Sequence, residues 1–303
     1  MSIGNEIVGR IPAKVKLSTH GIMIVLEPVP SVHVNIPVLT YHGVNVIRNT
    51  YAENDHLALA SDLHTIAACG FRVIPLSRVV DWHQGLVPDG DMAQTVALSL
   101  DDGAWFDFYD LEHPTCGMQR GMINILKDFN QQHAAKVHAT SFVIASPEAR
   151  SSLDKSCMIG QGWWGDEWWR QAAASGVMDV ECHSWDHVHP NLDEVAQLAQ
   201  LKGDFGLVKT YTDCNTQFAQ AGAYMGAQLG KRPSLFAYPY GQASNYAVNK
   251  YLPEYRPKHG FRAAFTTEPR AVSRSNNIWR LPRYVFGQDW KTPEALSDIL
   301  KAC

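Results

Sequence analysis

The chain has 303 residues, of which 46% are hydrophobic and 18% are charged, and its formal net charge is −4. This composition excludes a disordered protein, because disordered chains combine low hydrophobicity with a high net charge. No block of Lys and Arg residues stands out in the sequence, so nothing indicates binding to nucleic acid or to an anionic membrane surface.

Residues 1–35 are interpreted as an N-terminal extension that precedes the main domain, residues 36–303. The extension carries four charged residues between positions 6 and 16 and no long apolar stretch, so no signal peptide is visible. We therefore expect a cytoplasmic protein, or an exported one whose signal has been removed. The longest apolar run, residues 22–26, is far shorter than the ~18 residues that a membrane-spanning helix needs.

Short apolar runs rich in β-forming residues alternate with helical patterns along the main domain. The expected strands are residues 36–41, 71–74, 95–100, 139–144, 177–182, 235–238 and 262–265. The expected helices are residues 56–68, 77–83, 117–132, 166–174, 192–229 with a break near Gly203, 244–251 and 293–301. Such alternation predicts a parallel sheet covered by helices, and seven or so units in one chain indicate a closed α/β barrel. In these barrels the chemistry lies at the carboxyl ends of the strands.

Two carboxylates, Asp101 and Asp102, follow the strand expected at residues 95–100 and precede Gly103. An ordinary Asp-Gly turn is one interpretation of these residues. However, two adjacent carboxylates after a buried strand are costly unless something neutralises their charge. A metal ion would do so, with one carboxylate as its ligand and the other free to act as a base.

Histidines follow the strand expected at residues 177–182. His183 and His187 stand four positions apart, and His189 is a third candidate. They either lie in a surface loop without function or share a cation, because neutral imidazole is the commonest metal ligand. Together with Asp102, two histidines would form a three-ligand site with open positions, as is typical of catalytic zinc.

A turn at residues 238–241 follows the strand expected at residues 235–238. It either simply closes the strand or holds a backbone N–H toward a developing oxyanion.

These segments, in this order, resemble the polysaccharide deacetylases of the NodB-homology type, carbohydrate esterase family 4. The family motif TFDDG matches residues 99–103, H-S/T-x-x-H matches residues 183–187, and RxPYG matches residues 237–241 except at its first position. Residues 36–42 also resemble the PVLxYH strand of the branch that deacetylates poly-N-acetylglucosamine. The resemblance covers about residues 36–286.

The resemblance implies a distorted (β/α)7 barrel and a hydrolase that removes N-acetyl groups from an amino-sugar polymer. It implies that Asp102, His183 and His187 bind Zn²⁺ or another divalent transition metal. It assigns the role of catalytic base to Asp101. It also assigns the backbone N–H of Tyr240 to the oxyanion.

The family arginine that orients the base is replaced by Ala237 in this sequence. Arg283 follows the last strand-like segment of the chain, so we expect it to take the place of the missing arginine.

The late Leu-x-His of the family, which supplies the general acid, is also missing, since the last histidine is His259. His42, directly after the first expected strand, is the predicted acid, although it could equally be a hydrogen-bonded histidine at the rim. His189 and Asp101 itself are the alternatives.

Two other functions remain open at this stage. One is hydrolysis of small non-sugar amides on the same fold, and the other is carbohydrate binding without catalysis, which the two departures from the family pattern suggest. The tryptophans at positions 163, 164, 168 and 169 are either core residues or a sugar-stacking platform. The six scattered cysteines are expected to be free thiols, and the oligomeric state is open.

Overall fold

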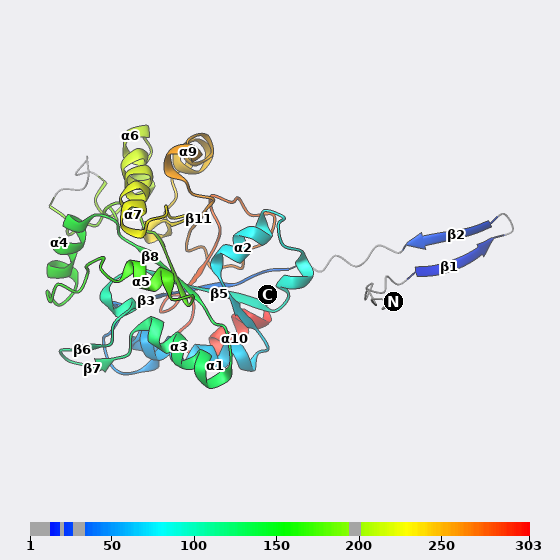
Figure 1. Ribbon diagram of the computed structural model, residues 1–303, viewed down its shortest axis with the longest axis horizontal. Coiled ribbons are helices and arrows are strands. Elements are labelled where there is room, and N and C mark those ends of the chain that lie inside the picture. The colour runs from blue at the N-terminus through cyan, green and yellow to red at the C-terminus, as the bar shows by residue number, and fades with distance from the viewer. Residues whose placement is uncertain (1–12, 19–20, 27–33, 194–200) are drawn as a thin grey trace, which may run out of the picture. The chain divides into compact units, whose positions relative to one another are not determined.

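The computed structural model describes residues 13–18, 21–26, 34–193 and 201–303 (Figure 1). Contacts between residues divide the chain into two units, residues 1–33 and 34–303, whereas the sequence placed the boundary after residue 35. The first unit contains an antiparallel hairpin of β1 (Ala13–Ser18) and β2 (Gly21–Leu26). All the candidate site residues lie in the second unit.

One parallel sheet forms the centre of the second unit, with the strand order β11-β10-β9-β8-β5-β3-β12 and with β4 paired to the first half of β5. Its strands are β3 (Val38–His42), β4 (Arg72–Ile74), β5 (Thr95–Asp101), β8 (Ala139–Val143), β9 (Met178–Cys182), β10 (Leu235–Ala237), β11 (Ala263–Phe265) and β12 (Tyr284–Val285). All seven strands predicted from the sequence are present. Within this sheet, as far as the structure describes it, β12, which has two residues, is the strand that was not expected.

The segment from residue 281 to residue 286 connects the two edges of this sheet. Leu281 pairs in parallel with Phe265 of β11, and a few residues later β12 pairs in parallel with Leu39 and Thr40 of β3. The sheet therefore curls round on itself. This confirms the predicted distorted (β/α)7 barrel.

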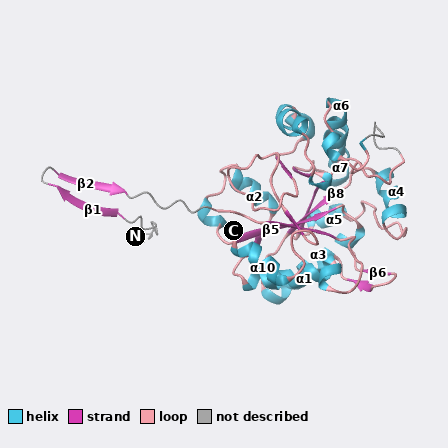
Figure 2. Cartoon of the chain, turned by 180° about the vertical axis from the view of Figure 1, so that it is seen from behind, coloured by secondary structure: helices cyan, strands magenta, loops and turns pink. Residues whose placement is uncertain are grey.

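Helices cover the outside of the sheet (Figure 2). They are α1 (Asp55–Ala68), α2 (Leu76–His83), α3 (Met122–His133), α4 (Pro147–Cys157), α5 (Trp169–Ala174), α6 (Tyr211–Cys214), α7 (Ala221–Leu229), α8 (Leu252–Glu254), α9 (Arg256–His259) and α10 (Pro293–Lys301). Helix α1 packs against α3 and α10. Its first turn is capped by the side chain of Asn54, which accepts hydrogen bonds from two backbone N–H groups of that turn.

Two helix predictions are wrong in part. Residues 117–119 form β7 (Gly117–Gln119), which pairs with β6 (Leu111–His113), and α3 begins only at Met122. The apolar spacing typical of the helix continues into this hairpin, and the apolar pattern of a sequence cannot show that a segment pairs with another strand.

The helical stretch predicted over residues 192–229 is confirmed only in part: the expected break near Gly203 is present, but the helix that follows it starts later than predicted. Residues 194–200 lie outside the described part of the chain. In the remainder, a short 3-10 helix covers Phe205–Leu207, and the α-helical run begins only at Tyr211. This run passes through a π-helix, Asn215–Gln220, before α7. Gly203 has a φ of +76°, which interrupts an α-helix.

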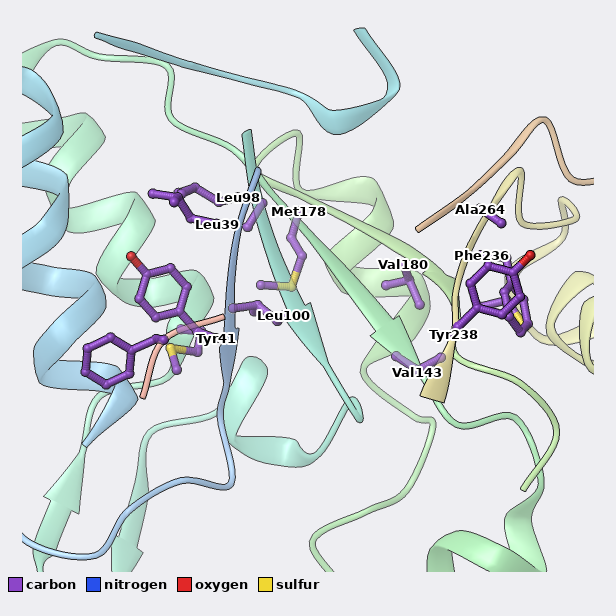
Figure 3. Packing of buried hydrophobic residues seen from close by; sticks show 14 of the residues in the cluster. Leu39, Tyr41, Leu98, Leu100, Val143, Met178, Val180, Phe236, Tyr238 and Ala264 are labelled. Atoms are coloured by element: carbon purple, nitrogen blue, oxygen red, sulfur yellow. The ribbon is translucent and has the colours of Figure 1, made fainter. Parts of the chain in front are cut away.

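Side chains alternate between the inside of the barrel and the layer between sheet and helices. On β5, Leu98 and Leu100 face outward into the cluster drawn in Figure 3, together with Leu39 and Tyr41 of β3. Ala97 belongs to a separate cluster, which fills the barrel. Because the strand period is two residues, Asp101 falls on the same inner side as Ala97.

Three of the four clustered tryptophans, Trp164, Trp168 and Trp169, are buried, so they are core residues, whereas Trp163 is half-buried. All six cysteines are free, as expected, but only Cys182 and Cys214 are buried. Among the described helices, none is long and apolar enough to cross a membrane.

Candidate active site

The residues that follow β3, β5, β9 and β10 meet at one cavity of about 430 Å³. Its walls contain His189 and six of the seven residues to which the sequence analysis assigned a catalytic or metal-binding role. Those six are His42, Asp101, Asp102, His183, His187 and Tyr240. The seventh, Arg283, is completely buried behind the cavity wall.

Asp102, His183 and His187 bring one ligand atom each to within 4.8 Å of one another. Oδ1 of Asp102 lies 3.7 Å from Nε2 of His183 and 3.5 Å from Nε2 of His187. Ligands at ~2.1 Å around a tetrahedral ion are about 3.4 Å apart, so these separations suit an ion such as zinc.

The hydrogen bonds of His183 and the burial of His187 keep ligand lone pairs available. Nδ1 of His183 lies 2.9 Å from the carbonyl oxygen of Ala237, to which it donates, and this leaves the lone pair on Nε2. Burial, followed by the neighbouring His183, holds the pKa of His187 well below its usual range, so its ring is neutral. The donor set thus fits a divalent transition metal.

His189, the other histidine considered from the sequence, does not join this cluster. Its ring centre is 5.7 Å from that of His187, and its ring nitrogens lie 3.8 and 3.9 Å from Sγ of Cys157. The structure therefore brings His187, and not His189, together with Asp102 and His183.

Backbone strain is concentrated in the loops that present these side chains. Among the described residues, seven other than glycine have a positive φ, and five of them lie in these loops: Asp102, Ser184, His187, Val188 and Tyr240. Each such conformation costs ~1–3 kcal/mol and persists only where the surroundings enforce it. One interaction that stabilises such a conformation lies in the loop after β9, where Oγ of Ser184 accepts a hydrogen bond from the backbone N–H of His187.

Gly103 is required at its position in the loop after β5. Its φ is +73°, and a Cβ built there would lie 2.3 Å from Cγ1 of Val143 on the neighbouring strand. Only glycine allows the chain to turn this close to β8 and so to place Asp102 at the barrel mouth.

Arg283 holds the carboxylate of Asp101 with two parallel hydrogen bonds. Its Nη1 and Nη2 donate to Oδ1 and Oδ2 at 2.7 and 2.8 Å, and its Nε donates to the carbonyl of Thr266 at 3.1 Å. Burial by itself raises the pKa of Asp101, but the charge of Arg283 outweighs this and, with His183, holds the pKa well below its usual range. Asp101 is therefore ionised at neutral pH, and the predicted contact with Arg283 is present.

The two remaining candidates, His42 and Tyr240, come from the end of β3 and from the turn after β10. His42 is half-buried and pairs in register with Asp101 on the neighbouring strand. Tyr240 has a φ of +57°, and its ring lies edge-on to that of His187 with 4.6 Å between the ring centres.

Sequence reasoning named Trp164 but missed its contact with one of these loops, and it missed Gln217 altogether. Nε1 of Trp164 donates to the carbonyl of Asp102 at 3.1 Å. Gln217, on the π-helix, is completely buried, and its amide donates to Asp186 and accepts from the backbone N–H of Trp185. An aromatic residue and a glutamine far along the chain carry no local signal that links them to these loops, although π-helices are often found at functional sites.

Asp107, in the segment that follows β5, is a further missed residue and is completely buried. Its Oδ2 accepts a hydrogen bond from Ser141 at 2.6 Å, and its Oδ1 has no partner among the described residues. Burial and, to a lesser extent, the carboxylates of Asp102 and Asp101 raise its pKa to about 8.

This raised pKa predicts how stability varies with pH. Because the folded protein favours the protonated carboxyl, the contribution of Asp107 to stability falls as the pH rises from its usual value of 3.8 to about 8. Asp107→Asn removes this loss of stability. The melting temperature of the variant, relative to that of the parent, should therefore be higher at about pH 8 than at about pH 5. Thermal unfolding at both pH values measures this difference in melting temperature. The same difference at the two pH values would show that Asp107 is already ionised at the lower one.

A larger cavity of about 510 Å³ lies between α1 and α3. It contains none of the candidate site residues, and neither ring nitrogen of its buried His56 is free, since both are bonded to backbone carbonyls. We therefore place the chemistry in the smaller cavity.

A sequence model of the family described as polysaccharide deacetylase matches residues 90–263. The matched region is more than half of the chain, and it includes the segments that contribute Asp101, the three candidate ligands and Tyr240. No curated protein matches the chain in a sequence search.

Solved structures show the same fold at low sequence identity. The deacetylase PplD of Streptococcus pyogenes, solved in complex with acetate, superposes with a TM-score of 0.60 at 18% identity, covering 88% of this chain and 99% of that one. IcaB from Ammonifex degensii has a TM-score of 0.58 at 19% identity, covering 88% and 97%. A de-N-acetylase from Aggregatibacter actinomycetemcomitans has a TM-score of 0.56 at 16% identity, covering 87% and 99%.

Proposed function

This chain belongs to the polysaccharide deacetylase family. We propose that it removes N-acetyl groups from an amino-sugar polymer with the help of a bound divalent metal ion, for which we propose zinc. One observation carries the proposal. The Asp102–His183–His187 cluster and a carboxylate fixed by a buried arginine line the same cavity.

Each of the clustered residues has one role in this proposal. Asp102, His183 and His187 would hold the ion, which would supply a Lewis acid for the acetamide carbonyl and would lower the pKa of a water molecule. Asp101 accepts the proton of the attacking water. The backbone N–H of Tyr240 donates a hydrogen bond to the developing oxyanion.

Arg283 and His42 complete the proton transfers. Arg283 keeps Asp101 ionised and fixes both of its oxygens, so the base needs no rearrangement before it accepts a proton. His42 donates a proton to the departing amine, because an amide anion is a very poor leaving group.

The substrate that we propose is a neutral N-acetylated polymer of the poly-N-acetylglucosamine type. No Lys or Arg is among the described residues that line the cavity, so nothing there would attract an acidic polymer. The fold is also shared with structures described as IcaB and as a de-N-acetylase.

A substrate comparison tests the proposal. Zinc-loaded protein should release acetate from N-acetylglucosamine oligomers faster than from small non-sugar amides, and protein treated with a chelator should release none until zinc is restored. The reverse preference would favour a small-amide hydrolase. Oligomer binding without acetate release would indicate a carbohydrate-binding protein.

Metal analysis tests the three ligands. Protein purified without chelator should contain about one equivalent of zinc, and Asp102→Ala and His187→Ala should lose it, because a catalytic zinc site usually has only three protein ligands. His189→Ala is the matched control and should retain the metal. A fully loaded Asp102→Ala variant would contradict the assignment.

The role of His42 predicts a selective loss of turnover. His42→Ala should lower kcat by ~10²–10⁴-fold, the usual contribution of a general acid, with unchanged zinc content. The alkaline limb of the pH–rate profile should also disappear, because it reports deprotonation of the acid. An unaltered kcat and alkaline limb would transfer the role to Asp101, which would then return the proton that it took from water.

A further inference from the structure

The loop after β9, residues 183–188, carries two of the three proposed metal ligands on a strained backbone. Ser184, His187 and Val188 have φ values of +73°, +61° and +51°, although none of them is glycine. Left-handed backbone is unfavourable for residues with a side chain, so it persists only where the surroundings enforce it. The position of the two histidines therefore depends on the contacts that hold this loop.

The side chain of Gln217 reaches this loop from the π-helix and is completely buried. Its Nε2 donates to Oδ1 of Asp186 at 2.8 Å, and its Oε1 accepts from the backbone N–H of Trp185 at 3.2 Å. The same oxygen of Asp186 accepts from the backbone N–H of Val188 at 3.0 Å. One buried amide thus holds the segment directly before His187 and, through Asp186, the residue directly after it.

The π-helix allows two neighbouring residues to make different buried contacts. Its hydrogen bonds join each residue to the fifth one along, so it has more residues in each turn than an α-helix, and consecutive side chains diverge less in direction. The ring of Phe218 packs against that of Phe236 on β10, with 4.4 Å between the ring centres, while Gln217 bonds to the loop after β9. The π-helix thus places a polar side chain at the loop without interrupting the packing on β10.

The two hydrogen bonds of Gln217 matter more for the metal site than for the stability of the fold. Hydrogen bonds of a buried amide contribute only modestly to stability, because they replace hydrogen bonds with water. Groups that orient ligand residues commonly set the metal affinity, because side chains already in position lose less conformational freedom on binding. Nε2 of His183 and Nε2 of His187 lie 3.7 and 3.5 Å from Oδ1 of Asp102, so a small displacement of the loop would open the cluster.

We propose that Gln217 is a positioning residue of the metal site, which holds the loop after β9 in its strained shape before an ion binds and so raises the affinity of the site for zinc. This inference rests on the proposed function, in which His183 and His187 are ligands of that ion.

The zinc affinity of Gln217→Met tests this role. Methionine has a similar unbranched shape but forms neither of the two hydrogen bonds. Chelator competition should show a zinc dissociation constant ~10–100-fold higher than that of the parent, the usual effect of removing a group that orients a metal ligand. The measurement is made at a temperature where circular dichroism shows both proteins to be folded, because a merely structural role would leave the zinc affinity of the folded protein unchanged.

Gln220→Met is the matched control. It makes the same exchange on the same π-helix, at a position that is exposed to solvent, so its zinc dissociation constant should equal that of the parent. An unchanged dissociation constant in Gln217→Met, or an equal rise in Gln220→Met, would overturn the proposal.

Hydrogen exchange in the metal-free parent tests the loop without any substitution. The backbone N–H groups of Trp185 and Val188 bond to the side chains of Gln217 and Asp186, so they should exchange far more slowly than in an unfolded chain. Both should exchange faster in Gln217→Met. Exchange at the rate of an unfolded chain in the parent would show that the loop is not held before zinc binds, and it would overturn the proposal.

These measurements separate the role of Gln217 from the proposed activity. If the parent binds zinc but deacetylates no substrate, and Gln217→Met binds zinc more weakly, the activity fails and the positioning role stands. If the parent is an active deacetylase and Gln217→Met binds zinc equally tightly, the positioning role fails and the activity stands. A parent that binds no zinc would overturn both.

Discussion

Replacement of Asp101 with asparagine should lower kcat for deacetylation by ~10²–10⁴-fold, the usual contribution of a general base, while the protein still binds about one equivalent of zinc. The reason is that the two adjacent carboxylates have different proposed roles, Asp101 as the base and Asp102 as a metal ligand. Asp101 faces Arg283 inside the barrel, whereas Oδ1 of Asp102 faces both histidine Nε2 atoms. Asparagine keeps the shape of the side chain but cannot accept the proton of water.

The comparison with Asp102→Asn makes this test specific. That variant should lose zinc and activity together, because it removes a ligand. Equal loss of zinc in the two variants would contradict the assignment of Asp101 as the base and Asp102 as the ligand. Since Asp101→Asn leaves the buried charge of Arg283 unpaired, rates should be compared at a temperature where circular dichroism shows both variants to be folded.

Replacement of Arg283 with methionine should remove activity and also destabilise the fold by ~3–5 kcal/mol, which is the usual cost of breaking a buried ion pair by deleting one partner. The side chain of Arg283 is completely buried and that of Asp101 is 5% exposed. The carboxylate left behind would have its pKa raised by burial, and its orientation would no longer be fixed. Chemical denaturation and steady-state kinetics measure the two effects separately.

Two further variants distinguish charge from geometry at position 283. Arg283→Lys retains the positive charge but cannot form two parallel hydrogen bonds, so it should recover part of the stability and little of the activity. The double variant Asp101→Asn/Arg283→Met removes both charges and should be more stable than either single variant. A fully active Arg283→Met protein would refute the orienting role.

The sequence contained enough local information for the barrel and for most of the candidate site. The strands were found because buried strands in a parallel sheet are short, apolar and separated by helical patterns. The positions of Asp101, Asp102, His183 and His187 followed from this, since polar residues directly after such strands gather at one end of the barrel.

Local patterns failed where pairing between distant segments decides the conformation. Residues 117–119 fit the apolar period of the following helix, yet they pair with Leu111–His113 as a hairpin. The sequence indicated the break near Gly203, but its apolar period did not show that the α-helix resumes only at Tyr211.

The sequence by itself determined the strand–helix order, the family motifs and the residue types of the metal cluster, because each of these features depends only on residues that are close together in the sequence. It nominated Arg283 as a partner for Asp101, but their contact spans 182 residues and exists because the segment containing Arg283 closes the barrel between β11 and β3. Only the tertiary structure brings His187, and not His189, to 3.5 Å from Oδ1 of Asp102, in a loop where the backbone of His187 has a positive φ. Only the tertiary structure placed Gln217 against the loop after β9 and buried Asp107 beside Ser141, because the burial of a polar side chain and the neighbours it meets depend on how distant elements pack.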